Sequence, residues 1–228
     1  MLKTPLILVN FKTYLEATGK KAVLLAKICE KVAKKYKIEI AIAVQAADIA
    51  AISKKSRIPV LAEHVDFAEP GAHTGSILPE AVKEAGANGA LINHSEHQIP
   101  LVEIQKTVAR AKSAGLTAVV CADVPQKARD VARFAPDFIA IEPPELIGGN
   151  VSVSTAKPEV ITQTLDEVSK INKDIPVLCG AGVKTKEDVA IAVKLGAKGI
   201  LVASGVTKSM DPEEVLIDFC NGIKEGLK

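Results

Sequence analysis

Residues 116–142, LTAVVCADVPQKARDVARFAPDFIAIE, hold the pattern that decides the fold. The stretch begins with the apolar run Leu116–Ala122 and ends with the run Phe138–Ile141, and a segment of helical pattern separates them. A continuous run of Ile, Leu, Val and Ala is typical of a strand buried on both faces, as in a parallel sheet that helices cover. The stretch therefore predicts a strand, a crossover helix and a second, parallel strand.

Similar apolar runs recur along the whole chain, which gives eight predicted strands. The other six runs are Leu6–Val9, Ile38–Val44, Pro59–Ala62, Gly89–Ile92, Pro176–Cys179 and Gly199–Ala203. Helix start signals lie between them: Ser76 ahead of Pro79, Thr185 three residues before Asp188, and Asp211 ahead of Pro212. Eight units in 228 residues, without a linker or a shift in composition, predict an α/β fold of the closed (β/α)₈ barrel type, with residues 1–228 forming a single domain.

An open, doubly wound sheet that binds a dinucleotide is the competing fold. That fold needs a glycine-rich turn after the first strand, whereas here the strand leads into Asn10-Phe11-Lys12. The partial match Gly180-Ala181-Gly182 lacks the third glycine of the fingerprint. Dinucleotide binding is therefore a weak interpretation.

Composition excludes several classes of partner. The 29 Lys and Arg and 27 Asp and Glu are interleaved and give a net charge of +2, so no basic stripe is available for a nucleic-acid backbone. Two Tyr, five Phe and no Trp also leave few rings for base stacking. No apolar run approaches the length of a signal peptide or a membrane span, and the four cysteines form no CxxC pair. We expect a soluble, cytoplasmic protein with reduced core thiols and no nucleic-acid or membrane partner.

Polar residues follow most of the predicted strands, at the barrel face where active sites of this fold lie. They are Asn10, Lys12, Glu63, His64, Asn93, His94, Glu96, Asp123 and Glu142. The last two strands instead lead into small residues, Gly180-Ala181-Gly182 and Ala203-Ser204-Gly205. Small residues let backbone N–H groups approach an anion, so a phosphorylated substrate is expected there.

The segment Pro143–Gly149 has the composition of a lid. It begins with two rigid prolines and ends with two permissive glycines, so it is suited to swing as a unit over a bound ligand. An ordinary loop closed by turn residues explains the same composition about equally well.

Several short motifs together resemble one enzyme family. They are Asn10-Phe11-Lys12, Asn93-His94-Ser95-Glu96, Ile141-Glu142-Pro143 followed by Ile147-Gly148, and the small-residue segments after the last two strands. In order and spacing they resemble the triosephosphate isomerase family along the whole chain, and the compact length with two lid prolines is similar to its short archaeal members. The resemblance implies an isomerase of glycolysis and gluconeogenesis that interconverts dihydroxyacetone phosphate and D-glyceraldehyde 3-phosphate through an enediolate.

The same resemblance assigns roles to individual residues. The family is itself the worked example of a carboxylate base paired with a neutral imidazole, which here are Glu142 and His94, with Ser95-Glu96 expected to begin the helix that keeps the ring uncharged. Lys12 would stabilise negative charge on the substrate, and Asn10 would position Lys12 and the substrate oxygens. The expected phosphate-binding residues are Asn10, Lys12, Ile147, Gly148, Gly182, Ala203 and Ser204, with Glu96 and Thr74 in support. No metal and no organic cofactor is implied.

The chain also departs from the family at several positions. The family more often has Trp at Phe11, a Val-Trp lid tip at Pro144-Glu145, Arg at His97 and Gln at Glu63. Glu63 adds a potential negative charge near the third strand.

Self-association is the other implication of the resemblance. The segment Glu69–Gly75, which includes Thr74, resembles the long third loop that reaches into a neighbouring subunit in this family. We expect a homodimer or, from the archaeal likeness, a homotetramer formed through helices four and five, with Leu101, Val102 and Val131 as exposed apolar side chains.

Other interpretations stay open on the residues alone. Lys12 is also explained as a solvated lysine, His94 as a hydrogen-bonded strand-end histidine and Glu96 as an acid in a helix first turn. His94 and His97 lie at metal-ligand spacing on a helix, but no third ligand is evident. Another phosphate-binding barrel enzyme, or a non-catalytic barrel that binds sugar phosphates, remains an alternative function.

Overall fold

A computed structural model describes residues 2–143 and 152–228 of the chain. The predicted lid falls mostly outside these residues. Glu145 and the expected phosphate contacts Ile147 and Gly148 therefore lie outside the described part.

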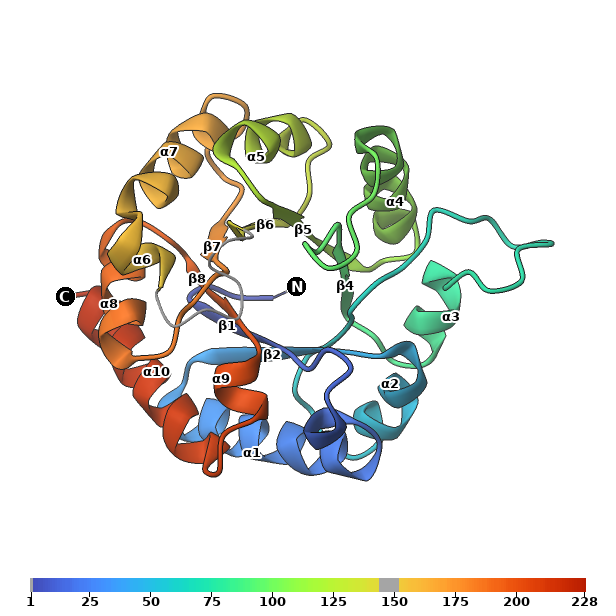
Figure 1. Cartoon of the computed structure of the whole chain (residues 1–228). Coiled ribbons are helices and arrows are strands. Elements are labelled where there is room, and N and C mark those ends of the chain that lie inside the picture. Colours follow the sequence, from blue (N-terminus) through green and yellow to red (C-terminus); the bar gives the residue numbers. More distant parts are fainter. Residues whose placement is uncertain (1, 144–151) are drawn as a thin grey trace.

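Eight parallel strands close into a barrel in sequence order, and the last strand pairs with the first (Figure 1). The strands are β1 (Leu6–Asn10), β2 (Glu39–Val44), β3 (Val60–Ala62), β4 (Gly89–Ile92), β5 (Thr117–Ala122), β6 (Phe138–Ile141), β7 (Val177–Cys179) and β8 (Gly199–Val202). Each lies within one residue of a predicted apolar run. The (β/α)₈ prediction is confirmed, and the open sheet is excluded because Leu6 of β1 pairs with Gly199 of β8.

Helices surround the barrel in the order that the chain supplies them (Figure 1). They are a short 3₁₀ turn η1 (Leu15–Ala17), α1 (Lys20–Tyr36), α2 (Ala46–Ser53), α3 (Pro79–Glu84), α4 (Leu101–Ser113), α5 (Pro125–Ala132), α6 (Val153–Ala156), α7 (Pro158–Ser169), α8 (Lys186–Lys194), α9 (Ser204–Thr207) and α10 (Pro212–Gly226). Among the described residues, no helix combines the length and the apolar character needed to cross a membrane.

Two of the three helix start signals act as expected. The Thr185 side chain accepts a hydrogen bond from the Asp188 N–H, and Asp188 bonds back, so α8 begins with a capping box. Asp211 caps α10 by accepting from the Glu214 N–H, and Pro212 occupies the first turn. The Ser76 signal was wrong as a cap: α3 begins at Pro79 behind Leu78, whose side chain makes no capping bond.

Two apolar cores explain why the strand sequences do not alternate. Along β1, Leu6 and Leu8 belong to a cluster inside the barrel, whereas Ile7 and Val9 pack in the layer between strands and helices. Every residue of β1 is buried, so both faces demand apolar side chains. All four cysteines are buried and free, as predicted.

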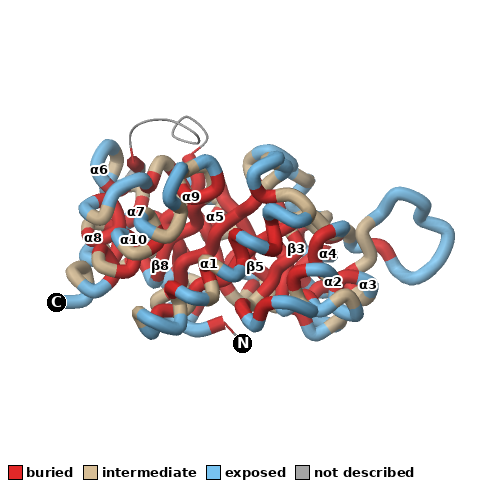
Figure 2. The backbone as a smooth tube through the Cα atoms, turned by 90° about the horizontal axis from the view of Figure 1, so that it is seen from below, coloured by how far each residue is buried: buried red, intermediate tan, exposed pale blue. Residues whose placement is uncertain are grey.

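One loop leaves the compact outline of the barrel. Residues 69–76 are all exposed and project beyond α3 and α4 (Figure 2). Arg110 of α4 fixes the base of this loop by donating from Nη2 to both carboxylate oxygens of Glu80, at 2.7 and 2.9 Å, and to the Ala68 carbonyl at 3.2 Å.

The expected interface residues divide into two groups. Leu101 and Val102, in the first turn of α4, are 44% and 57% exposed. Val131 of α5 is fully buried, so its expected exposure was wrong. Val131 instead belongs to the apolar layer between the strands and the helices.

Candidate active site

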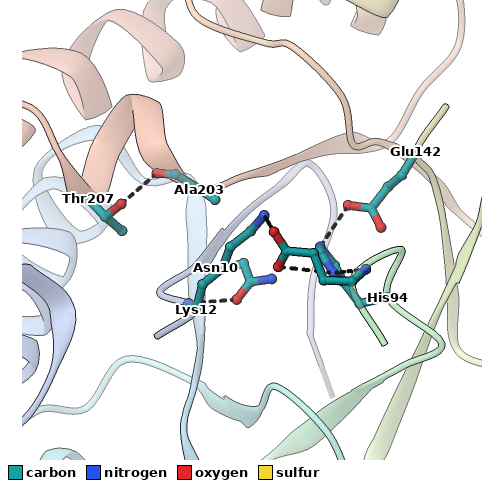
Figure 3. Close-up of polar contacts among 7 residues, drawn as sticks. Asn10, Lys12, His94, Glu142, Ala203 and Thr207 are labelled. Carbon is teal, nitrogen blue, oxygen red and sulfur yellow. Dashed lines mark hydrogen bonds and ion pairs between the residues drawn. The ribbon is translucent and has the colours of Figure 1, made fainter. Parts of the chain in front are cut away.

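Side chains from three strand ends meet at the carboxyl end of the barrel (Figure 3). Asn10 ends β1 and Lys12 follows two residues later, His94 follows β4, and Glu142 follows β6 directly. A cavity touches all four side chains and also Gly182, Ala203 and Ser204 from beyond β7 and β8. Each of these residues was expected from its place after a strand.

Glu142 is buried beside the imidazole of His94. Its Oε1 lies 3.4 Å from His94 Nε2, and the residue is 3% exposed. Its Oε2 is buried and has no hydrogen-bond partner among the described residues. A buried carboxylate oxygen without a donor costs free energy, so this oxygen is available to a group that the described residues do not supply.

Two neighbours define the space around Glu142. A Cβ on Gly180 would lie 2.6 Å from Glu142 Cγ, so only glycine leaves room for the carboxylate side chain. Cys121 of β5 lies on another side, where burial and then the nearby Glu142 carboxylate raise the pKa of its thiol well above the ordinary value. The thiol therefore stays neutral and does not compete as a second base.

The orientation of His94 is fixed by its own turn. The Glu96 N–H donates to His94 Nδ1 at 3.2 Å, and the His97 N–H donates to the His94 carbonyl at 2.7 Å. A ring nitrogen that accepts has no proton, so the imidazole carries its proton on Nε2, the atom that faces Glu142. The expected helix start at Ser95-Glu96 was wrong, because these residues form a turn and α4 begins only at Leu101.

Lys12 is held at both its backbone and its ammonium group. The Asn10 side chain accepts from the Lys12 N–H at 3.0 Å, and Lys12 has the left-handed φ of 48°. Its Nζ lies 2.8 Å from Glu96 Oε1. Lys12 is thus an ordered ion-pair partner rather than a freely solvated lysine. Glu96 acts as the partner of Lys12 and not as an acid in the first turn of a helix.

The expected anion site lines the same cavity as Glu142. Gly182 has a φ of 70°, and α9 begins at Ser204, with the Ala203 carbonyl accepting from the Val206 and Thr207 N–H groups at 3.0 Å each. The N–H group of Ser204 lies in the first turn of α9, ahead of the N–H groups that make these bonds. Backbone N–H groups in the first turn of a helix favour a bound anion.

Asp188 anchors the segment that follows Gly182. Its Oδ2 accepts from the Lys184 and Thr185 N–H groups at 3.0 and 2.9 Å. The turn that carries the expected anion site is therefore tied to the first turn of α8.

Some expected residues are not brought to the cavity, and one residue was missed. Thr74 lies in the exposed loop and lines neither cavity at this face. Asp123 pairs with Lys127 at 3.0 Å instead. Tyr14, which sequence reasoning did not single out, lines the cavity with Lys208 Nζ 4.3 Å from its ring centroid. The position of Tyr14, two residues after Lys12 in the same strand-end loop, could have identified it as a residue of this cavity.

A second cavity adjoins the first and shares Asn10, Lys12 and His94 with it. Glu63, from the end of β3, lines this second cavity. His64 and His97 stack there with ring centroids 4.3 Å apart. His97 thus faces His64 and does not pair with His94, and in the described part of the chain no group of three or more His, Cys, Asp or Glu could hold a metal ion.

Comparison with known proteins adds the family. A family model described as triosephosphate isomerase matches residues 5–223. The chain is similar to triosephosphate isomerase of Methanobacterium bryantii, with 47% identity over 97% of this chain and 98% of the relative. It is also similar to the enzymes of that name from Sulfurisphaera tokodaii, with 48% identity over 96% of this chain and 95% of the relative, and from Metallosphaera sedula, with 44% identity over 100% and 99%.

A solved structure supports the fold independently. The crystal structure of triosephosphate isomerase from Bartonella henselae superposes with a TM-score of 0.76, with 97% of this chain and 100% of that chain covered, at 19% sequence identity. The family match spans nearly the whole chain and includes all three strand ends that meet around Glu142. The chain belongs to the triosephosphate isomerase family.

Proposed function

We propose that this chain interconverts dihydroxyacetone phosphate and D-glyceraldehyde 3-phosphate through an enediolate, with residues 1–228 acting as one catalytic domain in the cytoplasm. One observation carries the proposal: the Glu142 carboxylate and the His94 Nε2 atom lie 3.4 Å apart on the wall of a cavity that Lys12 also lines. The reaction places the enzyme in glycolysis and gluconeogenesis.

The reaction needs a base beside two carbons and a proton donor beside two oxygens. Glu142 removes a proton from C1 of dihydroxyacetone phosphate and returns it to C2, which requires a carboxylate free on the side of the substrate. The buried, unpartnered Oε2 supports this role. His94 donates from Nε2 to the substrate oxygens and moves the hydroxyl proton from one oxygen to the other.

A neutral imidazole suits that second role. Its proton affinity is closer to that of an enediolate oxygen than the affinity of a cation would be. The free-energy cost of proton transfer is therefore small in both directions. The N–H bond from Glu96 to Nδ1 supports this protonation state, because a doubly protonated ring would turn two donors toward each other.

Lys12 supplies the fixed positive charge of the site. It attracts the phosphorylated substrate and stabilises the negative charge that develops on the enediolate. Asn10 holds the Lys12 backbone in its left-handed conformation. The phosphate lies against Gly182, Ala203 and Ser204, and residues 147 and 148 complete its binding site in this proposal.

Self-association belongs to the proposal as well. The exposed loop 69–76, with Thr74 in it, reaches a neighbouring subunit, and the exposed Leu101 and Val102 of α4 extend a dimer to a tetramer.

The test is a coupled assay of glyceraldehyde 3-phosphate isomerisation on the wild type, Glu142→Gln and His94→Gln. Both variants keep the size of the side chain, and circular dichroism checks their folding. We expect each to lose at least ~10³-fold in turnover, because base and electrophile act on one transition state. An inactive wild type at every temperature below its melting point would overturn the proposal.

The same variants separate the alternatives. Another phosphate-binding barrel enzyme would not need Lys12, His94 and Glu142 jointly. A non-catalytic barrel would bind sugar phosphates equally well after Glu142→Gln.

A further inference from the structure

Glu63 is a carboxylic acid at the active site that the proposed mechanism does not use. It follows β3 and lines the second cavity beside Lys12 and His94. Its Oε2 is buried and has no hydrogen-bond partner among the described residues. The charged form of a carboxyl group needs donors, and here the fold directs none at this oxygen.

The groups around Glu63 are titratable or charged on every side. Those that act on it or share its cavity are Lys12, Tyr14, Asp48, His64, His94, Glu96 and His97. The lysine of this group, Lys12, is already bonded to Glu96 at 2.8 Å, and Asp48 accepts from the Gly19 N–H. A second negative charge at Glu63 therefore has no free counter-ion in this cluster of described residues.

Burial raises the pKa of Glu63 above its ordinary value, and repulsion from Glu96 and Asp48 adds to this; Lys12, and His94 whenever its ring is protonated, act in the opposite direction. Glu63 therefore stays a neutral acid up to a higher pH than an exposed glutamate does. The unpartnered Oε2 atom and the negatively charged neighbours of Glu63 both favour the neutral acid.

We propose that Glu63 couples protonation to binding of the anionic substrate: the site takes its phosphorylated ligand at full strength only while Glu63 is a neutral acid. The inference rests on the proposed function and adds to it a residue that sets affinity through Lys12 without touching the substrate. When Glu63 loses its proton, a new negative charge lies in the cavity that Lys12 also lines, and the Lys12 ammonium group must attract the substrate phosphate. Part of the field of Lys12 is then cancelled before the substrate arrives.

Linkage fixes the direction of the pH effect. A ligand that prefers the protonated form raises the pKa of Glu63 when it binds, so binding takes up a proton from solvent. Affinity is highest below the pKa of Glu63 in the free enzyme, and it falls as the pH rises through that value. It levels off above the pKa of Glu63 in the complex.

The experiment compares wild type with Glu63→Gln, which keeps the shape of the side chain and removes its titration. The values of kcat/KM for glyceraldehyde 3-phosphate are measured from about pH 5 to about pH 9. Comparing the two proteins at each pH cancels titration of the substrate phosphate. We expect the advantage of the variant over wild type to grow as the pH rises and to reach about tenfold at the alkaline end, mainly through a lower KM.

A matched control removes one negative charge elsewhere. Glu16 lies in η1 near the same face but is exposed, so Glu16→Gln should follow the wild-type profile throughout. Binding of sulfate, a dianion that does not titrate in this range, is measured as a dissociation constant at each pH. It should weaken with pH in wild type more steeply than in Glu63→Gln.

The outcomes separate the two proposals. An active wild type whose profiles match those of Glu63→Gln overturns the role of Glu63 and leaves the isomerase intact. A Glu63→Gln variant that loses activity by the same factor at every pH also overturns it, because only a structural role behaves that way. An inactive wild type overturns the proposed function, whereas the sulfate measurement still tests Glu63.

Discussion

A glycine decides where the catalytic carboxylate lies. The backbone of Gly180 approaches Glu142 so closely that a methyl group there would meet Glu142 Cγ at 2.6 Å and the Ile141 carbonyl at 3.1 Å. Real Cβ atoms do not tolerate the first of these distances, so the carboxylate must move if the methyl group is present.

Gly180→Ala should therefore lower kcat more than it raises KM. We expect a loss of at least about tenfold in kcat, because displacement of a catalytic group by a fraction of an ångström weakens the transition state more than the ground state. Steady-state kinetics of the folded variant measure the effect.

Unfolding experiments provide the control for that variant. In a Glu142→Ala background the Cγ atom that the added methyl group would meet is absent, so Gly180→Ala should destabilise this background less than it destabilises wild type. Equal losses in both backgrounds would place the strain at Ile141 instead.

Glu63 also gives a stability prediction with a definite sign. Its folded-state pKa is raised, so the unfolded chain releases the proton first as the pH rises, and the folded state loses stability from the ordinary pKa of glutamate, about 4.3, up through its own pKa. Glu63→Gln removes this loss. The gain in melting temperature of the variant over wild type should grow with pH across that window and then stay constant, as measured by calorimetry in a pH series.

Single residues show which parts of the site the sequence predicts and which it does not. The positions of Lys12, His94 and Glu142 after predicted strands placed them at one face of the barrel, and the family resemblance assigned their roles. The bond from the Glu96 N–H to His94 Nδ1 was not predicted, because it depends on a turn where the sequence favoured a helix start. The fit of Gly180 against Glu142 joins two different strand ends, and no local pattern records such a distance.

At the level of elements, the start of α8 links stability to binding. Asp188 is buried, closes the capping box with Thr185 and holds the Lys184 N–H, so it ties the first turn of the helix to the segment that carries Gly182.

Asp188→Ala should cost about 1–2 kcal/mol of unfolding free energy, the usual effect of losing a helix cap. It should also raise KM several-fold, because the turn at the expected anion site loses its anchor. Urea unfolding and steady-state kinetics measure the two effects.

Asp211→Ala is the matched control for this prediction. Asp211 is the N-cap residue of α10 and accepts from the Glu214 N–H, whereas Asp188 is the third residue of the α8 capping box; Asp211 also stabilises a helix start, but it lines neither cavity at the active-site face. A comparable stability loss with unchanged KM is expected. A KM that rises equally in both variants would show that helix stability alone controls binding.

Strands were easier to predict than helix faces. The apolar runs located all eight strands because both faces of each strand pack against a core. Successive positions along a strand are therefore apolar. A helix buries one side only, and which side depends on its neighbours. Val131 was placed on the wrong side of α5, because the face that α5 turns to the core is a property of the assembled barrel.

At the scale of the whole molecule, self-association makes a separate prediction. Replacing Leu101 and Val102 together with lysine places two charges on an exposed apolar turn, so the assembly should shrink while the activity per subunit is retained. Sedimentation equilibrium and the coupled assay provide the measurements.

Leu24→Lys serves as the control, because Leu24 is 61% exposed on α1, far along the chain from α4. It should leave the assembly unchanged. If the double lysine variant sediments like wild type, the first turn of α4 is not an interface.

The pairing of β1 with β8 determines when the barrel can close during synthesis. Residue 6 pairs with residue 199, and a Cβ on Gly199 would fall 1.9 Å from the Leu6 carbonyl oxygen, so the two strands fit without room for a side chain. During synthesis β1 leaves the ribosome first and waits, with an unpaired edge, until β8 has followed it. Until that moment Lys12 and Ser204 do not line a common cavity, so we expect the nascent chain to be inactive. We therefore expect the activity of a newly made molecule to appear only after β1 and β8 have paired.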